Sequence, residues 1–478
     1  MKKSAIVAAA LLLGCHTLPP ELLPPPFGPD GPKPPRLFFP TGLAVASNGL
    51  LVANGNFNRA FEAGTVVQIS GGYIDSLLKS TIDCDVDPAT LDQATKDACY
   101  PQILPAEFIG SAMIGNYAGP LALSSDHTAV FTASRDTATI NAVQVRATAR
   151  PDGTLGCLPN AGNDATRDCR KGIIDLTAAG LDGPYTVIPG DAIPPGTGSP
   201  LDVLFVSSLV PHIETIISGS TPLTSTSVAA LSMQDASQLL FQMRAGSEFV
   251  AGGFGVGPMV FDRSRRRLFL GGCFQRSSAF GSGEPGTGPC FGIQANYLRI
   301  IDVDAGSAAD PVLIDLRPDV QSINTTQLLL DTPGGPATPS SPITTLWATM
   351  RSPDTLVVID LPAQPSVPPR VREVIPLPAS PADMARIDRG TSPPLLAVVA
   401  EKIGAVSIVD TGTSQVVAQV GRLGDSPFNI ASVDCPTTKR GSACLAVSVF
   451  HECRVALIEV PKDDPSRSAL RALAGSCP

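Results

Sequence analysis

Short apolar runs of strand length recur along the whole chain, and Gly, Pro, Asp and Ser separate them. Residues 406–410, VSIVD, form one such run, which ends in an aspartate at a polar turn. Comparable runs lie at 65–70, 140–145, 227–232, 298–304, 355–361 and 455–460. Another apolar run precedes each of them, at 50–54, 129–134, 203–208, 267–272, 345–350, 395–400 and 444–449. Runs rich in Val, Leu and Ile and bounded by turn residues are typical of buried β-strands.

Two further runs complete a repeated unit of four. Stretches in which Gly or Ser with Pro bends the chain precede several of these pairs, at 40–49, 119–127, 257–265, 380–388 and 426–434. A more variable run follows, at 73–78, 173–177, 238–243, 311–316, 372–377 and 416–420. One such outer run is missing from this set. We expect either 35–39 or 468–475 to supply it, with a ring closed by a strand from the opposite terminus.

Four antiparallel strands repeated seven times predict an all-β protein, a β-propeller of seven four-stranded blades that bury their faces on one another. Six or eight blades are alternatives, and so is a pair of β-sandwiches. The sandwich pair does not explain why the aspartate-ended run recurs seven times. We interpret Asp302, Asp360 and Asp410 at the ends of these runs as turn formers, and we expect Trp347 in the core.

The repeated unit resembles the YVTN-type propeller repeat. In that repeat Pro-Gly leads into an apolar strand, an Asp-Gly turn, a second strand, a strand ending in Ile-Asp, and a Val-Val strand. Residues 395–432 match this order closely, and residues 40–70 and 257–304 match it in part. The resemblance covers residues 37–460. It implies the propeller fold and carries no catalytic residues.

The N-terminus has the pattern of a secretory signal. Lys2 and Lys3 precede an apolar run, residues 5–13, which is too short to span a bilayer. The following LLGC resembles a bacterial lipobox, which implies that residues 1–14 are cleaved and that Cys15 is acylated. A residue other than aspartate after the cysteine, here His16, resembles outer-membrane sorting. Residues 15–36 would form the anchor and a proline-rich spacer, and residues 37–478 a single propeller domain.

The remaining cysteines are even in number, as expected of a chain exported to an oxidising compartment. Sequence alone does not assign connectivity. Metal ligation is the competing interpretation, but the chain has no C-x-x-C spacing and only 4 histidines. We therefore predict disulfides between cysteines that neighbour each other in sequence: Cys84 with Cys99, Cys157 with Cys169, Cys273 with Cys290, Cys435 with Cys444, and Cys453 with Cys477. The last pair would clamp the C-terminal tail to the last blade.

Composition and charge exclude some classes of partner and cofactor. The net charge of −9 argues against non-specific nucleic-acid binding, and the 44 Gly and 47 Pro among 478 residues indicate many turns. No Walker A loop, G-x-S-x-G elbow, H-E-x-x-H motif or dinucleotide fingerprint occurs. The sequence therefore predicts no cofactor and no catalytic or metal-binding residues.

In a propeller of this pattern, the loops after the second and fourth strands share one face around the central channel. Binding groups usually lie on loops carried by a rigid scaffold. This reasoning gives a mixed-charge candidate binding face, with a solvated loop rim as the alternative interpretation. The face comprises Asn54, Asn56, Arg135, Asp136, His212, Arg276, Arg351, Glu401, Lys402, His451 and Glu452.

Four stretches lengthen the loops between strands, at residues 79–118, 146–200, 273–296 and 317–343, and we interpret them as insertions suited to recognition. The resulting hypothesis is a non-enzymatic, lipid-anchored propeller of the bacterial cell envelope, at the outer membrane, that binds a protein or an envelope component. The alternative is an enzyme with a site in the central channel, because propellers resembling this one include lactone hydrolases and quinoprotein subunits.

Overall fold

The computed structural model describes most of the chain between residues 23 and 477. The described ranges are 23–27, 35–150, 153–170, 176–194, 196–209, 212–214, 223–233, 238–248, 257–271, 274–277, 286–289, 297–304, 312–316, 319–320, 324–331, 343–362 and 367–477. Cys15, His16, Cys273 and Cys290 lie outside them. Among the described residues, no helix is long and apolar enough to cross a membrane.

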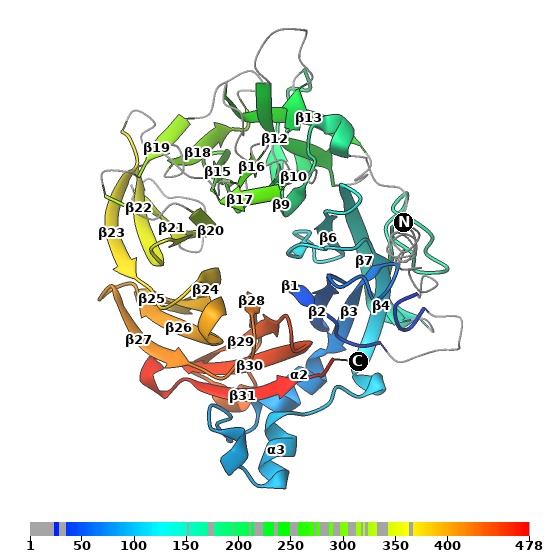
Figure 1. Cartoon of the computed structure of the whole chain (residues 1–478), viewed down its shortest axis with the longest axis vertical. Coiled ribbons are helices and arrows are strands. Elements are labelled where there is room, and N and C mark those ends of the chain that lie inside the picture. Colours follow the sequence, from blue (N-terminus) through cyan, green and yellow to red (C-terminus); the bar gives the residue numbers. More distant parts are fainter. Residues whose placement is uncertain are drawn as a thin grey trace, which may run out of the picture.

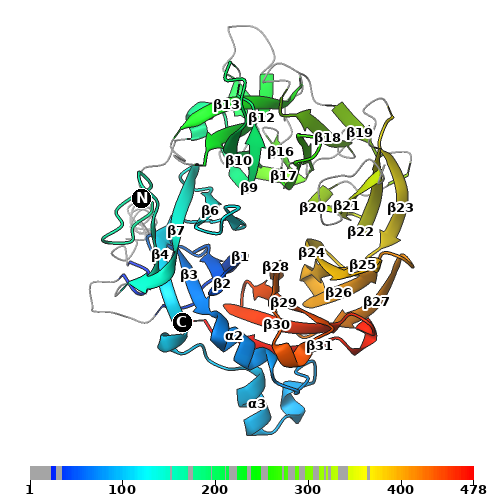
Figure 2. The same cartoon turned by 180° about the vertical axis from the view of Figure 1, so that it is seen from behind.

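The described strands form seven four-stranded antiparallel blades in a ring, which confirms the predicted fold (Figures 1 and 2). Blade 1 contains β1 (Pro40–Ala46), β2 (Gly49–Asn54), β3 (Gly64–Ser70) and β4 (Phe108–Ile114). Blade 2 contains β5 (Ala122–Leu123), β6 (Ala129–Ser134), β7 (Thr139–Arg150) and β8 (Gly153–Cys157). Blade 3 contains β9 (Pro184–Ala192), β10 (Leu201–Ser208), β12 (Leu223–Ser232) and β13 (Leu239–Glu248), with β11 (His212–Glu214) also paired to β12.

The other four blades follow in chain order. Blade 4 contains β14 (Met259–Asp262), β15 (Arg267–Leu270), β18 (Tyr297–Asp302) and β19 (Val312–Asp315), and a hairpin of β16 (Phe274–Ser277) and β17 (Gly286–Pro289) interrupts it. Blade 5 contains β20 (Asn324–Asp331), β21 (Ile343–Arg351), β22 (Thr355–Pro362) and β23 (Arg370–Pro376). Blade 6 contains β24 (Pro381–Arg389), β25 (Ser392–Ala400), β26 (Ala405–Asp410) and β27 (Gln415–Val420). Blade 7 contains β28 (Pro427–Val433), β29 (Ser442–Val449), β30 (Arg454–Pro461) and β31 (Ala469–Ala474).

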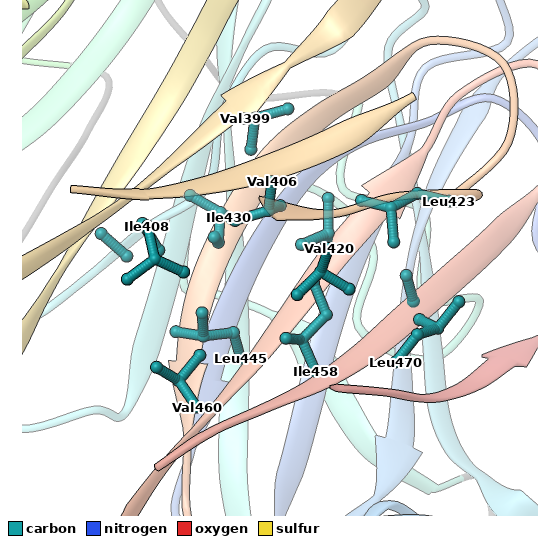
Figure 3. Packing of buried hydrophobic residues seen from close by; sticks show 14 of the residues in the cluster. Val399, Val406, Ile408, Val420, Leu423, Ile430, Leu445, Ile458, Val460 and Leu470 are labelled. Carbon is teal, nitrogen blue, oxygen red and sulfur yellow. The ribbon is translucent and has the colours of Figure 1, made fainter. Parts of the chain in front are cut away.

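Apolar packing between neighbouring blades forms the core. Every residue of β2 and β6 is buried, so both faces of these strands contact a neighbouring blade. Between blades 6 and 7, Val399 and Ile408 belong to the same cluster of buried side chains as Leu445 and Ile458 (Figure 3). Trp347 is 1% exposed, as predicted. Burial on both faces explains why these strands have continuous apolar runs instead of alternating ones.

Two of the predicted outer strands are wrong. Residues 73–78 lie in a helix, α2 (Gly71–Leu78), because its buried residues Ile74 and Leu78 are four apart and face the core with helical spacing. Residues 173–175 lie outside the described residues, and 176–179 form a 3₁₀ turn. The actual outer strands are β4 and β8, and β9 and β20 are first strands. All four lie wholly or largely within the stretches that we interpreted as insertions.

Blades 1 and 7 meet without exchanging a strand. The C-terminal segment supplies β31, so the missing outer strand lies at 468–475, one of the two predicted positions. All four strands of blade 7, however, come from the same end of the chain. Apolar side chains of both blades share one buried cluster, which includes Leu43 and Val52 of blade 1 with Ala446 and Leu457 of blade 7. The expectation that a strand from the opposite terminus closes the ring is therefore wrong.

A segment of blade 1 fastens this junction instead. We call residues 71–107 the closing segment; it runs from β3 to β4, contains α2 and α3 (Gln93–Cys99), and lies beside β30 and β31 on the outside of the ring (Figure 1). The amide of Cys84 donates to the carbonyl of Leu470 at 2.7 Å, and the amide of Gly475 donates to that of Pro101 at 3.0 Å. The Asp85 carboxylate accepts the amide of Gly421 in blade 6 at 2.8 Å. The closing segment thus connects blade 1 to blades 6 and 7.

Four disulfides have the predicted neighbour pairing. They are Cys84–Cys99, Cys157–Cys169, Cys435–Cys444 and Cys453–Cys477. Cys84–Cys99 lies within the closing segment and packs into the cluster between blades 6 and 7. Cys453–Cys477 joins the start of blade 7's third strand to the C-terminal tail, as predicted. The predicted pair Cys273–Cys290 lies outside the described residues.

Candidate binding site at the mouth of the central channel

A cavity of about 410 Å³ opens where the innermost strands meet, and every blade contributes to its lining. The size is within the range of small-molecule pockets. Its residues come from the loops after second strands and from the starts of first strands, which the loops after fourth strands enter. One lining residue from each blade, in order, is Thr41, Arg135, Tyr185, Pro258, Asn324, Ala382 and Phe428.

Arg135 is the most unusual charged group of the cavity. The loop between β6 and β7 carries it, and its guanidinium carbon lies 5.4 Å from the ring centre of Phe57 and 5.8 Å from that of Tyr185. Its Nε is buried and has no hydrogen-bond partner among the described residues. Burial lowers the pKa of Arg135 from its ordinary value, and burial likewise raises the pKa of Tyr185. Stacking between two aromatic rings stabilises this cation less than full hydration in water would.

Arg351 differs from Arg135 because it already has an anionic partner. Its Nη2 lies 2.5 Å from Oε2 of Glu401, and its Nε donates to the carbonyl of Pro381 at 3.0 Å. The pair joins the end of β21 in blade 5 to the 3₁₀ turn after β25 in blade 6. The positive charge of Arg351 is therefore neutralised within the cavity wall.

Aromatic side chains form the wall near the junction of blades 7 and 1. The ring of Phe450 lies 4.9 Å from that of Phe57, 5.1 Å from that of Phe39 and 4.8 Å from that of His451. Phe428 lies 6.5 Å from Phe450. Phe57, Phe428, Phe450 and His451 all line the cavity. This wall offers apolar surface next to the guanidinium of Arg135.

The structure brings together four of the predicted face residues, Arg135, Arg351, Glu401 and His451, around one cavity. Lys402 is exposed beside it. Asp136 is turned towards Asn116 and Arg59, and Glu452 pairs with Arg454 at 2.7 Å. The side chains of His212 and Arg276 lie outside the described part of the structure.

Asn54 and Asn56 are not on the binding face. Both are completely buried in blade 1. The Asn54 amide group donates to the carbonyl of Arg36 and the hydroxyl of Thr65, and its oxygen accepts the amide of Phe38. Asn56 is bonded to both backbone groups of Phe61. These side chains satisfy buried backbone groups, so their role is structural.

Several cavity residues were not predicted, above all Tyr185, Asn324 and the aromatic wall. Tyr185 is the second residue of β9, and Asn324 is the first residue of β20. Both strands lie in stretches that we interpret from the sequence as loop insertions. The short apolar pieces within PYTVIPGDA and NTTQLLLD, Val-Ile and Leu-Leu-Leu, are the available signal for strands there. Among the described residues, no group of three or more His, Cys, Asp or Glu side chains could hold a metal ion.

The fold and the cavity define a seven-bladed β-propeller with a mixed-charge, aromatic site at its channel mouth. No protein-family model and no curated protein matches the chain. Among solved structures, hydrazine synthase of Kuenenia stuttgartiensis is similar, at 11% identity and a TM-score of 0.47, over 88% of this chain and 95% of that one.

Two further solved structures are also similar. The Cps50 (Swd1) β-propeller domain of Myceliophteria thermophila has 9% identity and a TM-score of 0.46, over 89% of this chain and 98% of that one. AztD of Citrobacter koseri has 10% identity and a TM-score of 0.42, over 91% and 87%. At these identities the likeness concerns the fold alone, and the strand topology is what establishes the seven blades.

Proposed function

We propose that this protein is a lipid-anchored propeller of the YVTN-repeat type in the bacterial cell envelope, where it binds a partner or an envelope component through the face around the channel mouth. The observation that carries the binding role is the cavity itself, which all seven blades build and which contains the half-buried guanidinium of Arg135, whose buried Nε has no hydrogen-bond partner among the described residues. Interior charges are normally paired, so an unpaired one at an open cavity favours a binding site.

The lining favours binding over catalysis. Glu401 is the only carboxylic residue among the described residues that line the cavity, and it is paired with Arg351. His451 is the only histidine there, and it is exposed next to the aromatic wall. General acid–base catalysis needs a proton donor or acceptor placed next to the reacting group. A salt-bridged carboxylate and an exposed imidazole are weak candidates for that role.

The anchor is tested at the cysteine of the lipobox. We expect Cys15→Ala to remove the protein from the membrane fraction, because no acyl chain would then hold it, and to leave the unprocessed precursor. Leu13→Ala is the matched control and should still be processed and anchored. Fractionation of envelope membranes measures both, and His16→Asp should move the protein from the outer to the inner membrane. An anchored Cys15→Ala protein would refute lipidation at this residue.

The binding face is tested by affinity capture of envelope components with the full mature protein. Lys402 is exposed on the face of the channel mouth, whereas Lys462 follows β30 and therefore lies at the opposite face. We expect Lys402→Glu to reduce the captured partner several-fold, because rim charges steer association, and Lys462→Glu to leave it unchanged. Quantitative mass spectrometry measures recovery. Equal recovery with both variants would place the partner elsewhere.

A further inference from the structure

The charges of the cavity do not balance. Two arginines, Arg135 and Arg351, face one carboxylate, that of Glu401, and Arg351 lies 2.5 Å from it. The adjacent Asp136 does not compensate Arg135, because it interacts with Arg59 and Asn116. The arginines and carboxylates of the described lining therefore leave one positive charge in excess.

A second polar atom of the cavity also lacks a partner. The side-chain oxygen of Asn324 is buried and accepts no hydrogen bond from the described residues. Asn324 starts β20 of blade 5 and Arg135 follows β6 of blade 2, and these two strands lie on opposite sides of the ring (Figure 1). The oxygen of Asn324 is closed off from the cavity, so the feature that points to a ligand is the charge of Arg135, which no described carboxylate neutralises.

The surroundings of Arg135 suit a planar anion. A guanidinium offers two parallel N–H donors that match a carboxylate, and stacking against Phe57 and Tyr185 restricts its orientation. Phe428 and Phe450 supply apolar surface for the rest of a ligand. A monoanion would balance the single excess charge, whereas a dianion would leave one negative charge without a partner.

We propose that the cavity binds a small monoanionic organic acid, with its carboxylate on Arg135 and its apolar body against the aromatic wall. This inference rests on the proposed binding function and specifies its ligand. A free aromatic acid and the C-terminal residue of a peptide share this chemistry, so both are tested.

The experiment uses the full mature protein in detergent and isothermal titration calorimetry with four probes. Phenylacetate represents a free acid, N-acetyl-L-phenylalanine represents a peptide end, phenylacetamide is the neutral isostere, and inorganic phosphate is the competing anion. We expect at least one of the two carboxylates to bind about tenfold or more tightly than phenylacetamide, because hydrogen bonds to charged groups are the strong ones. Whichever carboxylate binds more tightly identifies the source.

Variants then assign the effect to Arg135. Arg135→Gln should weaken carboxylate binding by about tenfold or more, Arg135→Lys should retain part of it, and the exposed Arg440→Gln is the matched control without effect. Arg135→Gln should also raise the midpoint of thermal unfolding of the ligand-free protein, because a half-buried charge without a carboxylate partner is removed. That increase shows that the variant is folded.

Three results would overturn the inference: equal binding of phenylacetate and phenylacetamide, tighter binding of phosphate than of either carboxylate, or unchanged binding by Arg135→Gln. The binding function would survive any of them if capture of a partner still depended on Lys402. Loss of that dependence, with carboxylate binding intact, would instead contradict the proposed face. The two proposals therefore fail separately.

Discussion

Replacing Glu459 with alanine is expected to lower the free energy of unfolding by about 3 kcal/mol, because two cations lose their carboxylate in a largely buried site. Glu459 lies on β30 of blade 7 and is paired with Lys439 at 2.5 Å and with Arg471 at 2.8 Å. Arg471 also donates to the carbonyl groups of Thr81 and Ile82, and Lys439 to that of Ser80. Glu459 thus holds the two side chains that fasten the closing segment to blade 7.

Urea unfolding followed by circular dichroism and by the fluorescence of Trp347, the only tryptophan, measures the change. Hydrogen exchange should also show faster exchange in residues 79–104, since their anchors are loosened. Glu107→Ala is the matched control, because Glu107 makes no ion pair among the described residues. A loss below about 0.5 kcal/mol, typical of surface substitutions, would show that the network does not fasten the ring.

The effect of Glu459 should depend on pH. Burial raises its pKa, but hydrogen bonds from Lys439, Ser442 and Arg471 outweigh burial, so the pKa lies below its ordinary value. A carboxyl group of this kind contributes stability that is fully present above its unfolded pKa of about 4.3 and is lost as the pH falls through the folded pKa. The difference between wild type and Glu459→Ala should therefore be constant at neutral pH and shrink below about pH 4.

The sequence allowed the blades to be predicted because most of their strands are buried on both faces and appear as uninterrupted apolar runs. The same logic located Arg135, Arg351, Glu401 and His451, since each ends or follows the second strand of its blade. It failed where a strand is polar or interrupted: Asn324 and Tyr185 belong to strands with mixed burial, which we interpreted as loops.

Side-chain direction was the second limit. Asn54 ends β2 in the same way that Ser134 ends β6. Only the fold shows that the side chain of Asn54 turns into blade 1 instead of onto the binding face.

The aspartates at the ends of strands illustrate the same limit. Asp410 and Asp302 accept amides of the following turns, as predicted. Asp360 is buried and pairs with Arg372 at 2.9 Å, because blade 5 offers a cation from its outer strand. Partners distant in sequence decide these roles.

Replacing Asp383 with alanine is expected to lower the free energy of unfolding by about 3 kcal/mol or more, as much as Glu459→Ala. The reason is that four hydrogen-bond donors would lose a buried acceptor. Asp383 lies on β24 and accepts the amides of Met384 and Ile430 at 2.8 and 2.9 Å. It also accepts the side-chain amides of Gln327 in blade 5 and Asn429 in blade 7. Asn429 in turn accepts the amide of Leu43 in blade 1 at 2.7 Å. This chain of hydrogen bonds links four consecutive inner strands across the junction of the ring.

Burial raises the pKa of Asp383, so its pH dependence is opposite to that of Glu459. A raised folded pKa means that stability falls as the pH rises from the unfolded value of about 3.9 through the folded value. Asp383→Asn removes this dependence and keeps one accepting oxygen, so it should cost less than Asp383→Ala. The exposed Asp202 on β10 supplies the control, Asp202→Ala. Equal urea midpoints for Asp383→Ala and Asp202→Ala would show that packing between blades, not this chain of hydrogen bonds, holds the inner strands together.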